Sequence, residues 1–241
     1  MNSNPFISIV TVSYNAVTTI EQTILSVLNQ TYSNIEYIII DGGSTDGTVD
    51  IIKKYTDKIS YWVSESDKGI YNAMNKGIDC STGDYILFCN ADDTLYSSTT
   101  IEECACFIDD FVDVLYGDLI FKYGEQLIKK ESKSSLDDFK KYMPLFHPAT
   151  FVKRNLLLDY KFDESYRIAA DYKLLYELYV NNYTFKKIDL VVSIFNAVDG
   201  ISNKNAILSI KESFKVRSRE KWYLWWPKWI IYYFLKRIGL I

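Results

Sequence analysis

The first 120 residues alternate between short apolar runs and segments with helical spacing. β-branched and aromatic residues dominate the runs Phe6–Val12, Ile35–Ile40 and Tyr85–Cys89, as is typical of buried strands. Between the first two runs, Thr18–Asn29 places its apolar residues at helical spacing. Strands that alternate with helices over short connections form right-handed βαβ units. The alternation therefore predicts an α/β fold with a mostly parallel central sheet flanked by helices.

The same two periods locate the other elements, although the pattern becomes mixed beyond residue 120. Strands are expected at Ile59–Val63, Val112–Tyr116 and Phe185–Val192, with a short hairpin within 121–131 and an extended segment at His147–Val152. Helices are expected at Thr48–Tyr55, Gly69–Asp79, Thr99–Phe111, Ser134–Tyr142 (exposed) and Ala170–Val180, and over most of 203–238.

Ligands of such sheets bind beyond the carboxyl ends of the strands, so the residues after each strand are candidates for chemistry. The turn Asp41–Thr48 reads Asp-Gly-Gly-Ser-Thr-Asp-Gly-Thr and opens a helix. Its glycines let the backbone approach a ligand, and a helix N-terminus favours anionic groups. The turn is neither a Walker loop nor a GxGxxG dinucleotide motif. The alternative is a tight turn in which Asp46 caps the helix.

Two adjacent carboxylates follow the fourth strand, in Asn90-Ala91-Asp92-Asp93. Holding them together is costly unless a cation neutralises them, and oxygen ligands suit Mg²⁺ or Mn²⁺. The alternative is a solvated acidic turn that starts the next helix. The segment Ser64–Gly77 also places polar residues where a strand passes into a helix. Spacing alone would leave most of those residues as ordinary surface positions.

Four segments, in this order and spacing, resemble the family 2 glycosyltransferases: Thr11–Asn15, Asp41–Thr48, Glu65–Gly77 and Asn90–Asp93. The resemblance covers roughly residues 5–195. It is greatest to bacterial enzymes that assemble capsule, O-antigen or exopolysaccharide of the colanic-acid kind. It implies the GT-A type of nucleotide-diphospho-sugar transferase fold and a transfer that inverts the configuration of the sugar.

The resemblance also implies a donor site, for which a UDP-sugar is the expected ligand. Asp41 would accept a hydrogen bond from the base, while Asp67 and Lys68 would lie near the ribose, the diphosphate or the sugar. The expected nucleotide-binding residues are Thr11, Ser13, Asn15, Asp41, Asp67, Lys68, Asn90 and Ala91, of which the first three would line the nucleotide pocket after the first strand.

The metal-binding Asp-x-Asp motif of the family is matched by Asp92, with Asp93 beside it. These two carboxylates are therefore the expected ligands of a divalent cation, Mn²⁺ or Mg²⁺. The sequence departs from the motif at Asn90, which stands at the position of the first Asp. A neutral amide is a weaker ligand for a hard cation than a carboxylate, so this departure bears on metal affinity.

The distal half supplies two further candidates. Ala169–Leu175 resembles the segment that carries the catalytic carboxylate of the family, which makes Asp171 the expected general base. A place at a helix start would keep Asp171 ionised and make it a weaker base; the alternative role is a helix cap. His147, in an apolar setting before Pro148, is expected either to contact the acceptor or the diphosphate, or to pack in the core.

Composition excludes several other classes. A formal net charge of −4 over 241 residues argues against a general nucleic-acid binder. Four cysteines without a CxxC pair and a single histidine do not fit the usual zinc sites. We expect reduced thiols in a cytosolic protein, because the N-terminus lacks a basic and apolar leader. No 18 consecutive residues are apolar, so we expect no membrane span.

The C-terminal end differs from the rest of the chain. Seven basic residues against one glutamate give residues 215–241 a net charge of +6, which leaves −10 for residues 1–214. Four of the five tryptophans lie within 222–229. Tryptophan favours the membrane interface, and basic side chains favour anionic headgroups. We therefore predict a catalytic domain at 1–200 and a membrane-associating helical extension at 201–241; a helix packed on the domain and a homodimer contact are the alternatives.

Taken together, the sequence predicts an inverting glycosyltransferase. It would act on a saccharide or lipid-linked acceptor in cell-surface polysaccharide synthesis, as a cytoplasmic enzyme on the inner face of the cell membrane. One alternative is a nucleotidyltransferase, although Ser13–Ala16 lacks the glycine-rich basic loop that usually holds a triphosphate. Another is a non-catalytic protein that binds a nucleotide sugar or the membrane, for which Asn90 is the one supporting feature.

Overall fold

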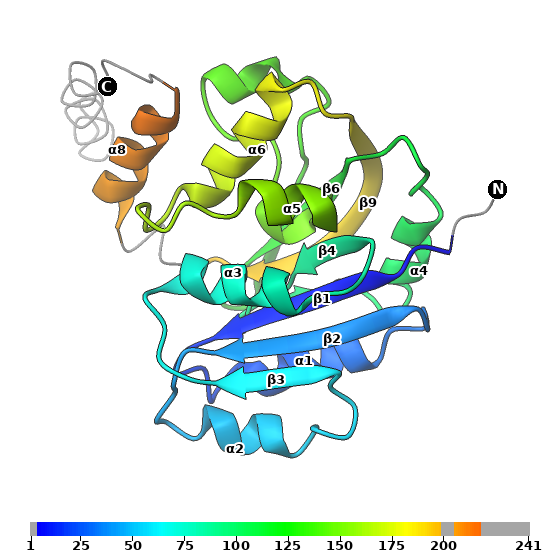
Figure 1. Ribbon diagram of the computed structural model, residues 1–241, viewed down its shortest axis with the longest axis vertical. Coiled ribbons are helices and arrows are strands. Elements are labelled where there is room, and N and C mark those ends of the chain that lie inside the picture. Colours follow the sequence, from blue (N-terminus) through cyan, green and yellow to red (C-terminus); the bar gives the residue numbers. More distant parts are fainter. Residues whose placement is uncertain (1–3, 199–204, 218–241) are drawn as a thin grey trace.

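The computed structural model describes residues 4–198 and 205–217 (Figure 1). Nine strands form one sheet in the order β3-β2-β1-β4-β8-β6-β9-β5, with β7 paired to β6. The strands are β1 Ile7–Ser13, β2 Ile35–Asp41, β3 Tyr61–Ser64, β4 Tyr85–Phe88, β5 Thr94–Leu95, β6 Val114–Tyr123, β7 Gln126–Lys130, β8 Thr150–Lys153 and β9 Phe185–Asn196. The helices are α1 Ile20–Leu28, α2 Thr48–Lys53, α3 Ile70–Cys80, α4 Thr100–Ala105, α5 Arg154–Tyr160, α6 Ala170–Val180 and α8 Ala206–Arg217, with the short 3-10 helices η1 Leu136–Lys140 and η2 His147–Ala149.

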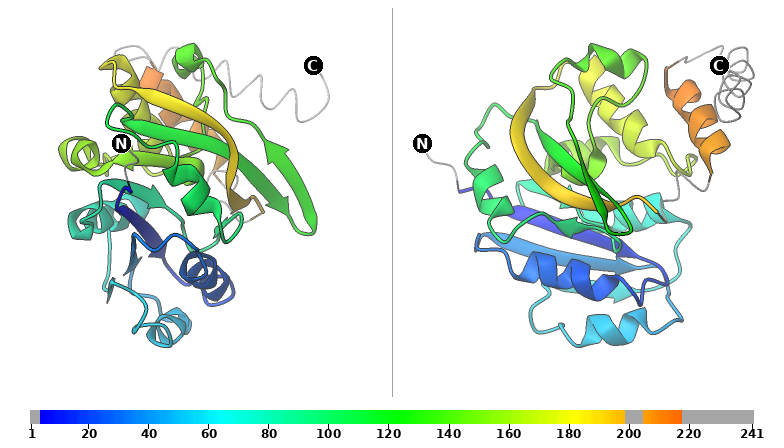
Figure 2. Two further views of the ribbon diagram at one scale, coloured as in Figure 1. Left: turned by 90° about the vertical axis from the view of Figure 1, so that its right-hand side faces the viewer. Right: turned by 180° about the vertical axis from the view of Figure 1, so that it is seen from behind.

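The first four strands are parallel, as the sequence predicts. Alternate side chains of β1 enter two different cores: Ile7 and Ile9 pack with α1, whereas Val10 and Val12 pack with α3. The helices α1 and α3 accordingly cover opposite faces of this part of the sheet (Figures 1 and 2). Burial on both faces is the reason that β1, β2 and β4 read as largely apolar runs rather than as alternating patterns, whereas the edge strand β3 is only partly buried.

The distal half adds antiparallel strands to this parallel unit. Strand β8 lies between β4 and β6 and is antiparallel to both, whereas β9 runs parallel to β6. The predicted strand Val112–Tyr116 and the predicted hairpin within 121–131 are parts of one feature, because β6 continues to Tyr123 and turns back into β7. Its first six residues are buried and its tip is exposed, so no single period runs through the strand.

Two expectations for the middle of the chain are wrong in detail. The exposed helix predicted at Ser134–Tyr142 is the 3-10 helix η1, in which Phe139 is fully buried. Phe139 packs against the rings of Tyr172, Tyr179 and Phe185, which come from α6 and β9. The extended segment predicted at His147–Val152 begins with η2 and becomes extended only from Thr150. Long-range packing fixes both segments, and it leaves little local periodicity in the sequence.

The C-terminal region is described only as far as Arg217. Helix α8 lies beside α6 (Figure 1), and its residues Glu212, Phe214 and Val216 are buried. The predicted extension at 201–241 therefore starts with a helix that packs on the body of the protein. The tryptophan-rich segment falls outside the described residues. Within 4–198 and 205–217, no helix combines the length and the apolar character that crossing a membrane requires.

Candidate functional site

The strand order creates a crevice at one edge of the sheet. Strands β2 and β3 lie on one side of β1, and β4 lies on the other side. At such a switch point the connections leave in opposite directions and open a gap at the carboxyl ends of the strands. The polar segments selected from the sequence lie at this edge.

Asp41, at the end of β2, organises the first part of the site. Its side chain is fully buried, and its carboxylate accepts hydrogen bonds from the hydroxyls of Ser13 (2.8 Å), Ser44 (2.5 Å) and Ser64 (2.6 Å). The backbone N–H groups of Gly43 and Ser44 also donate to it. Although burial alone would raise the pKa of Asp41, these bonds hold the pKa below its usual value. Asp41 is therefore an ionised hub that joins the ends of β1, β2 and β3.

The three residues predicted after β1 have different surroundings. Thr11 is fully buried, and its hydroxyl donates to the carbonyl of Cys89 (2.7 Å) and contacts the Tyr37 hydroxyl (3.0 Å). Its side chain supports the sheet from inside and does not line the crevice, in contrast to the prediction. Ser13 binds Asp41, and the exposed Asn15 accepts a hydrogen bond from the backbone N–H of Thr45 (3.0 Å). These last two connect β1 to the turn after β2.

Asp67 closes over the same turn. A Cβ atom at Gly42 would lie 2.4 Å from the Asp67 carboxylate, so a glycine is needed for this close approach. Asp67 also accepts the backbone N–H of Gly69 at 2.8 Å. Lys68 is exposed. Ser13, Asp41 and Asp67 therefore form one polar patch, and their contacts with a nucleotide stay a prediction.

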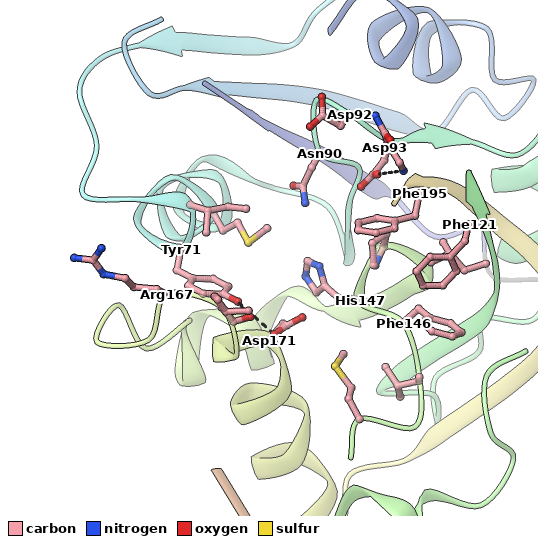
Figure 3. A pocket seen from close by; sticks show the side chains of 18 residues that line it. Tyr71, Asn90, Asp92, Asp93, Phe121, Phe146, His147, Arg167, Asp171 and Phe195 are labelled. Atoms are coloured by element: carbon pink, nitrogen blue, oxygen red, sulfur yellow. Dashed lines mark hydrogen bonds between the residues drawn. The ribbon is translucent and has the colours of Figure 1, made fainter. Parts of the chain in front are cut away.

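A cavity of about 410 Å³ lies at the end of β4, which pairs with β1, and it brings together residues from distant parts of the chain. Asn90, Asp92 and Asp93 line one side of it, and Asp171 lies on the other, with His147 between them (Figure 3). The cavity thus joins the two acidic segments that the sequence selected independently. The remaining wall is largely apolar, with the aromatic rings of Phe121, Phe146 and Phe195.

Asp92 and Asp93 differ sharply in environment. Asp92 is exposed and accepts a hydrogen bond from the Thr19 hydroxyl at 2.6 Å. Asp93 is 2% exposed, and its carboxylate accepts the backbone N–H of Asn196 at 3.3 Å. Burial, together with the nearby charge of Asp92, raises the pKa of Asp93 to about 8. A proton bound to Asp93 can therefore relieve the repulsion between the two carboxylates, so that a cation is not required for this purpose.

The residues at the end of β4 offer a partial ligand set for a cation. The Oδ1 atom of Asn90 is buried and has no hydrogen-bond partner, and the Asp92 carboxylate is exposed beside it. Both are hard oxygen ligands of the kind that Mg²⁺ and Mn²⁺ accept. Among the described residues, no three His, Cys, Asp or Glu side chains are grouped to hold a metal. The protein could thus supply two oxygens, and a bound diphosphate would have to supply others.

Asp171 begins α6 as predicted, but the expected effect on its acidity is wrong. Its Oδ1 accepts the N–H of Tyr172 (2.8 Å) and the hydroxyl of Tyr71 (3.3 Å). Burial nevertheless raises the pKa of Asp171 to about 6, because the cost of removing the carboxylate from water exceeds the gain from these bonds. Asp171 is therefore a stronger base than an exposed aspartate and is still ionised at neutral pH.

His147 packs in the core, which is one of its two expected roles, and its contact with the acceptor or the diphosphate stays a prediction. Its ring stacks on Phe88 at 5.3 Å and meets Phe162 edge-on at 5.7 Å, so it belongs to an aromatic cluster. It also lines the cavity between Asn90 and Asp171. Burial lowers the pKa of His147 to about 4, so the imidazole is neutral at physiological pH. It can donate or accept one hydrogen bond without bringing a positive charge.

Several residues of the site were not selected from the sequence. Tyr71 belongs to a segment that carries the family resemblance but was given no role of its own, and Arg167 stands four residues before Asp171. The three phenylalanines of the wall come from β6, β9 and the loop before η2. A single aromatic residue in a mixed pattern carries no local signal, so only the tertiary structure identifies these positions.

Comparisons with known proteins agree with this arrangement. The family model "Glycosyl transferase family 2" matches residues 8–170. A curated relative from Mycobacterium bovis, named PGL/p-HBAD biosynthesis glycosyltransferase, is 30% identical over 211 residues, which are 83% of this chain and 80% of the relative. An uncharacterized glycosyltransferase of Haemophilus influenzae is 35% identical over 120 residues, covering 48% of each chain.

Solved structures share the fold at lower identity. Staphylococcus aureus TarS 1–349 in complex with UDP-GlcNAc superposes with a TM-score of 0.71 at 21% identity, over 87% of this chain and 64% of TarS 1–349. The mannosyltransferase PcManGT from Pyrobaculum calidifontis, in complex with GDP-Man and Mn²⁺, gives 0.68 at 17% identity, over 88% of this chain and 63% of its own. The chain thus spans less than two thirds of either solved protein. The fold is of the GT-A type, and the chain belongs to glycosyl transferase family 2.

Proposed function

We propose that this glycosyltransferase moves a sugar from a nucleotide-diphosphate donor to a saccharide or lipid-linked acceptor, with inversion, in the synthesis of cell-surface polysaccharide or glycolipid. The observation that carries the proposal is the single cavity between Asp92 and Asp171. One wall lies at the end of β4, which pairs with β1, and the other wall presents a base. A donor and an acceptor can therefore meet between the two walls.

The reaction follows from this geometry. The donor nucleotide would lie over Ser13, Asp41 and Asp67, with its diphosphate toward Asn90 and Asp92. Asp171 would accept the proton of the acceptor hydroxyl while the acceptor oxygen bonds to the anomeric carbon. The bond from that carbon to the diphosphate oxygen breaks on the opposite side, which inverts the configuration. The nucleoside diphosphate leaves with the bonding electron pair.

A divalent cation fits the diphosphate side of the site. Asn90 and Asp92 would hold Mn²⁺ or Mg²⁺, and the ion would offset negative charge on the leaving diphosphate. The structural neighbour PcManGT contains Mn²⁺, which supports this expectation. Asn90 replaces Asp93 as the second proposed ligand of the cation. The Asp93 carboxylate is buried and accepts a hydrogen bond from the backbone of β9.

A UDP-sugar is the proposed donor, since TarS 1–349 binds UDP-GlcNAc on the same fold. The test is a panel of UDP-, GDP- and dTDP-sugars, with binding measured by calorimetry in the presence and absence of Mn²⁺ and turnover measured as release of nucleoside diphosphate. We expect tight, cation-dependent binding of one nucleotide class. Absence of binding by every member of the panel would contradict the function.

The rate of transfer should depend on pH through Asp171. The base must be ionised to accept a proton, and burial raises its pKa to about 6. Activity should therefore be lost as the pH falls through about 6 and be retained above it, with roughly a tenfold loss per pH unit well below the pKa. A profile of kcat between pH 3 and 8, with saturating donor, measures this. An acid limb near pH 4 would indicate a solvated carboxylate and contradict the assignment.

We further propose that the enzyme works on the inner face of the cell membrane, held there by the basic, tryptophan-rich segment. The full chain should float with liposomes containing about one third anionic lipid, and a chain ending at Arg217 should remain unbound. That end point keeps α8, which packs on the body. Equal flotation of the two chains would remove the membrane-binding role.

Light scattering of the same samples would detect the homodimer that the sequence also allows.

A further inference from the structure

Helix α8 presents one buried carboxylate to the loop that precedes the proposed base. Glu212 is 8% exposed. Its two carboxylate oxygens accept the backbone N–H groups of Arg167 (2.9 Å), Ile168 (2.8 Å) and Ala169 (3.0 Å). Three consecutive N–H groups converging on one carboxylate fix the direction of all three peptide planes, and they offset the cost of burying the charge.

The same loop is held from its other side by the site itself. The Tyr71 hydroxyl donates to the carbonyl of Ile168 at 2.5 Å and also approaches Asp171 Oδ1 at 3.3 Å. Ile168 therefore has its N–H fixed by α8 and its carbonyl fixed by α3. Asp171 follows three residues later, at the start of α6. Glu212 and Tyr71 thus hold residues 167–169 from two sides, and we call this pair of contacts the clamp. The position of the Asp171 carboxylate depends on it.

Glu212 also acts on Asp171 through its charge. Its negative charge contributes to the raised pKa of Asp171, after the larger effect of burial. The other charged or titratable groups around Asp171 are Tyr71 from α3, His147 from η2 and Arg167 from the clamped loop, with Asp92 and Asp93 across the cavity. Tyr71 and His147 are neutral at physiological pH, because burial raises the pKa of the first and lowers that of the second.

We propose that Glu212 is a positioning residue for Asp171, so that α8 is part of the catalytic unit although it lies beyond the residues matched by the family model. The inference rests on the proposed role of Asp171 as the base. A purely structural role would make Glu212 one contact among several that dock α8, such as Lys215 over the ring of Tyr166 at 4.1 Å. A positioning role requires changes in kcat and in pH dependence that loss of docking alone does not produce.

The test is the variant Glu212→Gln, with Glu177→Gln as the matched control. Gln keeps the size of the side chain but removes the charge and turns an N–H group toward the loop amides. Glu177 lies on α6 and pairs with Lys173 at 3.0 Å, whereas the N–H groups of residues 167–169 donate to Glu212. We expect Glu212→Gln to lower kcat about 10- to 100-fold, the scale set by a misplacement of about 1 Å. Its acid limb should move to lower pH, because a neighbouring negative charge is lost.

Donor affinity separates the two roles. Within the described part of the chain, the hydrogen bonds of Asp41 and Asp67 join residues 13–69 and none of them involves α8, so the dissociation constant of the donor nucleotide should stay within twofold of the wild-type value in both variants. The control Glu177→Gln should keep wild-type kcat and the wild-type acid limb. Wild-type kcat and pH profile in Glu212→Gln would overturn the proposal. So would a parallel loss of kcat and donor affinity, because it would indicate general disruption.

A second variant, Glu212→Asp, keeps the proposal testable if Glu212→Gln does not fold. Glu212→Asp keeps the charge and is one methylene shorter, so it should retain more of kcat than the Gln variant and keep the wild-type acid limb. For an unfolded Gln variant, Glu212→Asp is compared with Glu212→Ala: equal kcat in those two would overturn the proposal.

If the wild-type protein transfers no sugar at all, the proposed function fails. The clamp is then judged without substrate, by the Asp171 pKa from carboxyl NMR and by hydrogen exchange of the amides of residues 167–169.

Discussion

Replacing Asp171 by asparagine should reduce the rate of sugar transfer by about 10²- to 10⁴-fold, the range typical of losing a general base. The amide has the shape of the carboxylate but cannot take the proton of the acceptor hydroxyl. Because Asp171 lies across the cavity from Asp92, binding of the donor nucleotide should be nearly unchanged. The measurements are kcat with saturating substrates and the dissociation constant of the nucleotide, before and after substitution.

The matched control is Asp159→Asn, an exposed carboxylate on α5 that does not line the cavity. It should transfer at the wild-type rate. Thermal unfolding of the Asp171 variant should show no loss of stability at neutral pH, since burying an amide is less costly than burying the ionised acid. Transfer by Asp171→Asn within tenfold of the wild type would exclude Asp171 as the base.

Replacing Asp92 by asparagine should lower transfer by about 10²-fold and abolish the stimulation of nucleotide binding by Mn²⁺. With Asn90 already neutral, this substitution removes the one exposed carboxylate at the end of β4. Two amides are poor ligands for a hard cation, so negative charge on the leaving diphosphate would no longer be offset. Calorimetry of nucleoside diphosphate, with and without Mn²⁺, measures the first part of this effect.

The neighbouring substitution Asp93→Asn provides the contrast. Burial raises the pKa of Asp93 to about 8, so its side chain is mostly protonated at pH 7 and an amide closely resembles it. The backbone bond from Asn196 can be kept by the amide oxygen. The loss of transfer should therefore be at least tenfold smaller than for Asp92→Asn. Equal losses would mean that both carboxylates bind the cation, as the sequence alone suggests, and an unaffected Asp92 variant would exclude a metal at this edge.

The proximal half of the fold could be predicted because its physical cause is local. Strands such as Ile35–Asp41 are buried on both faces and therefore largely apolar, with Glu36 as an exception, and this strand ends in the polar residue Asp41 where it leaves the sheet. Parallel connections bring those ends to one edge. Asp41 and the segment with Asp92 could be selected for this reason, without any knowledge of their contacts, whereas Asp67 was selected from the family resemblance.

The distal half could not be predicted equally well. Phe139 reads as one apolar residue in a polar stretch, and its burial depends on rings from α6 and β9 that are 33 or more residues away. Strand β6 changes from buried to exposed along its length, which breaks the period. Thr11 was assigned to the pocket from the family resemblance, but it lies within β1 and its side chain is fully buried, in contact with the Tyr37 hydroxyl.

The sequence by itself determined the class of fold, the edge of the sheet that carries the chemistry, and the resemblance that identified the family. These depend on periodicity and on the order of short segments. Only the tertiary structure decided the state of each acidic group: Asp41 is held ionised by its donors, Asp93 is protonated near neutral pH, and the pKa of Asp171 lies near 6. The physical reason is that the cost of burying a charge depends on everything packed around it, and for Asp171 that includes Glu212, 41 residues further along the chain.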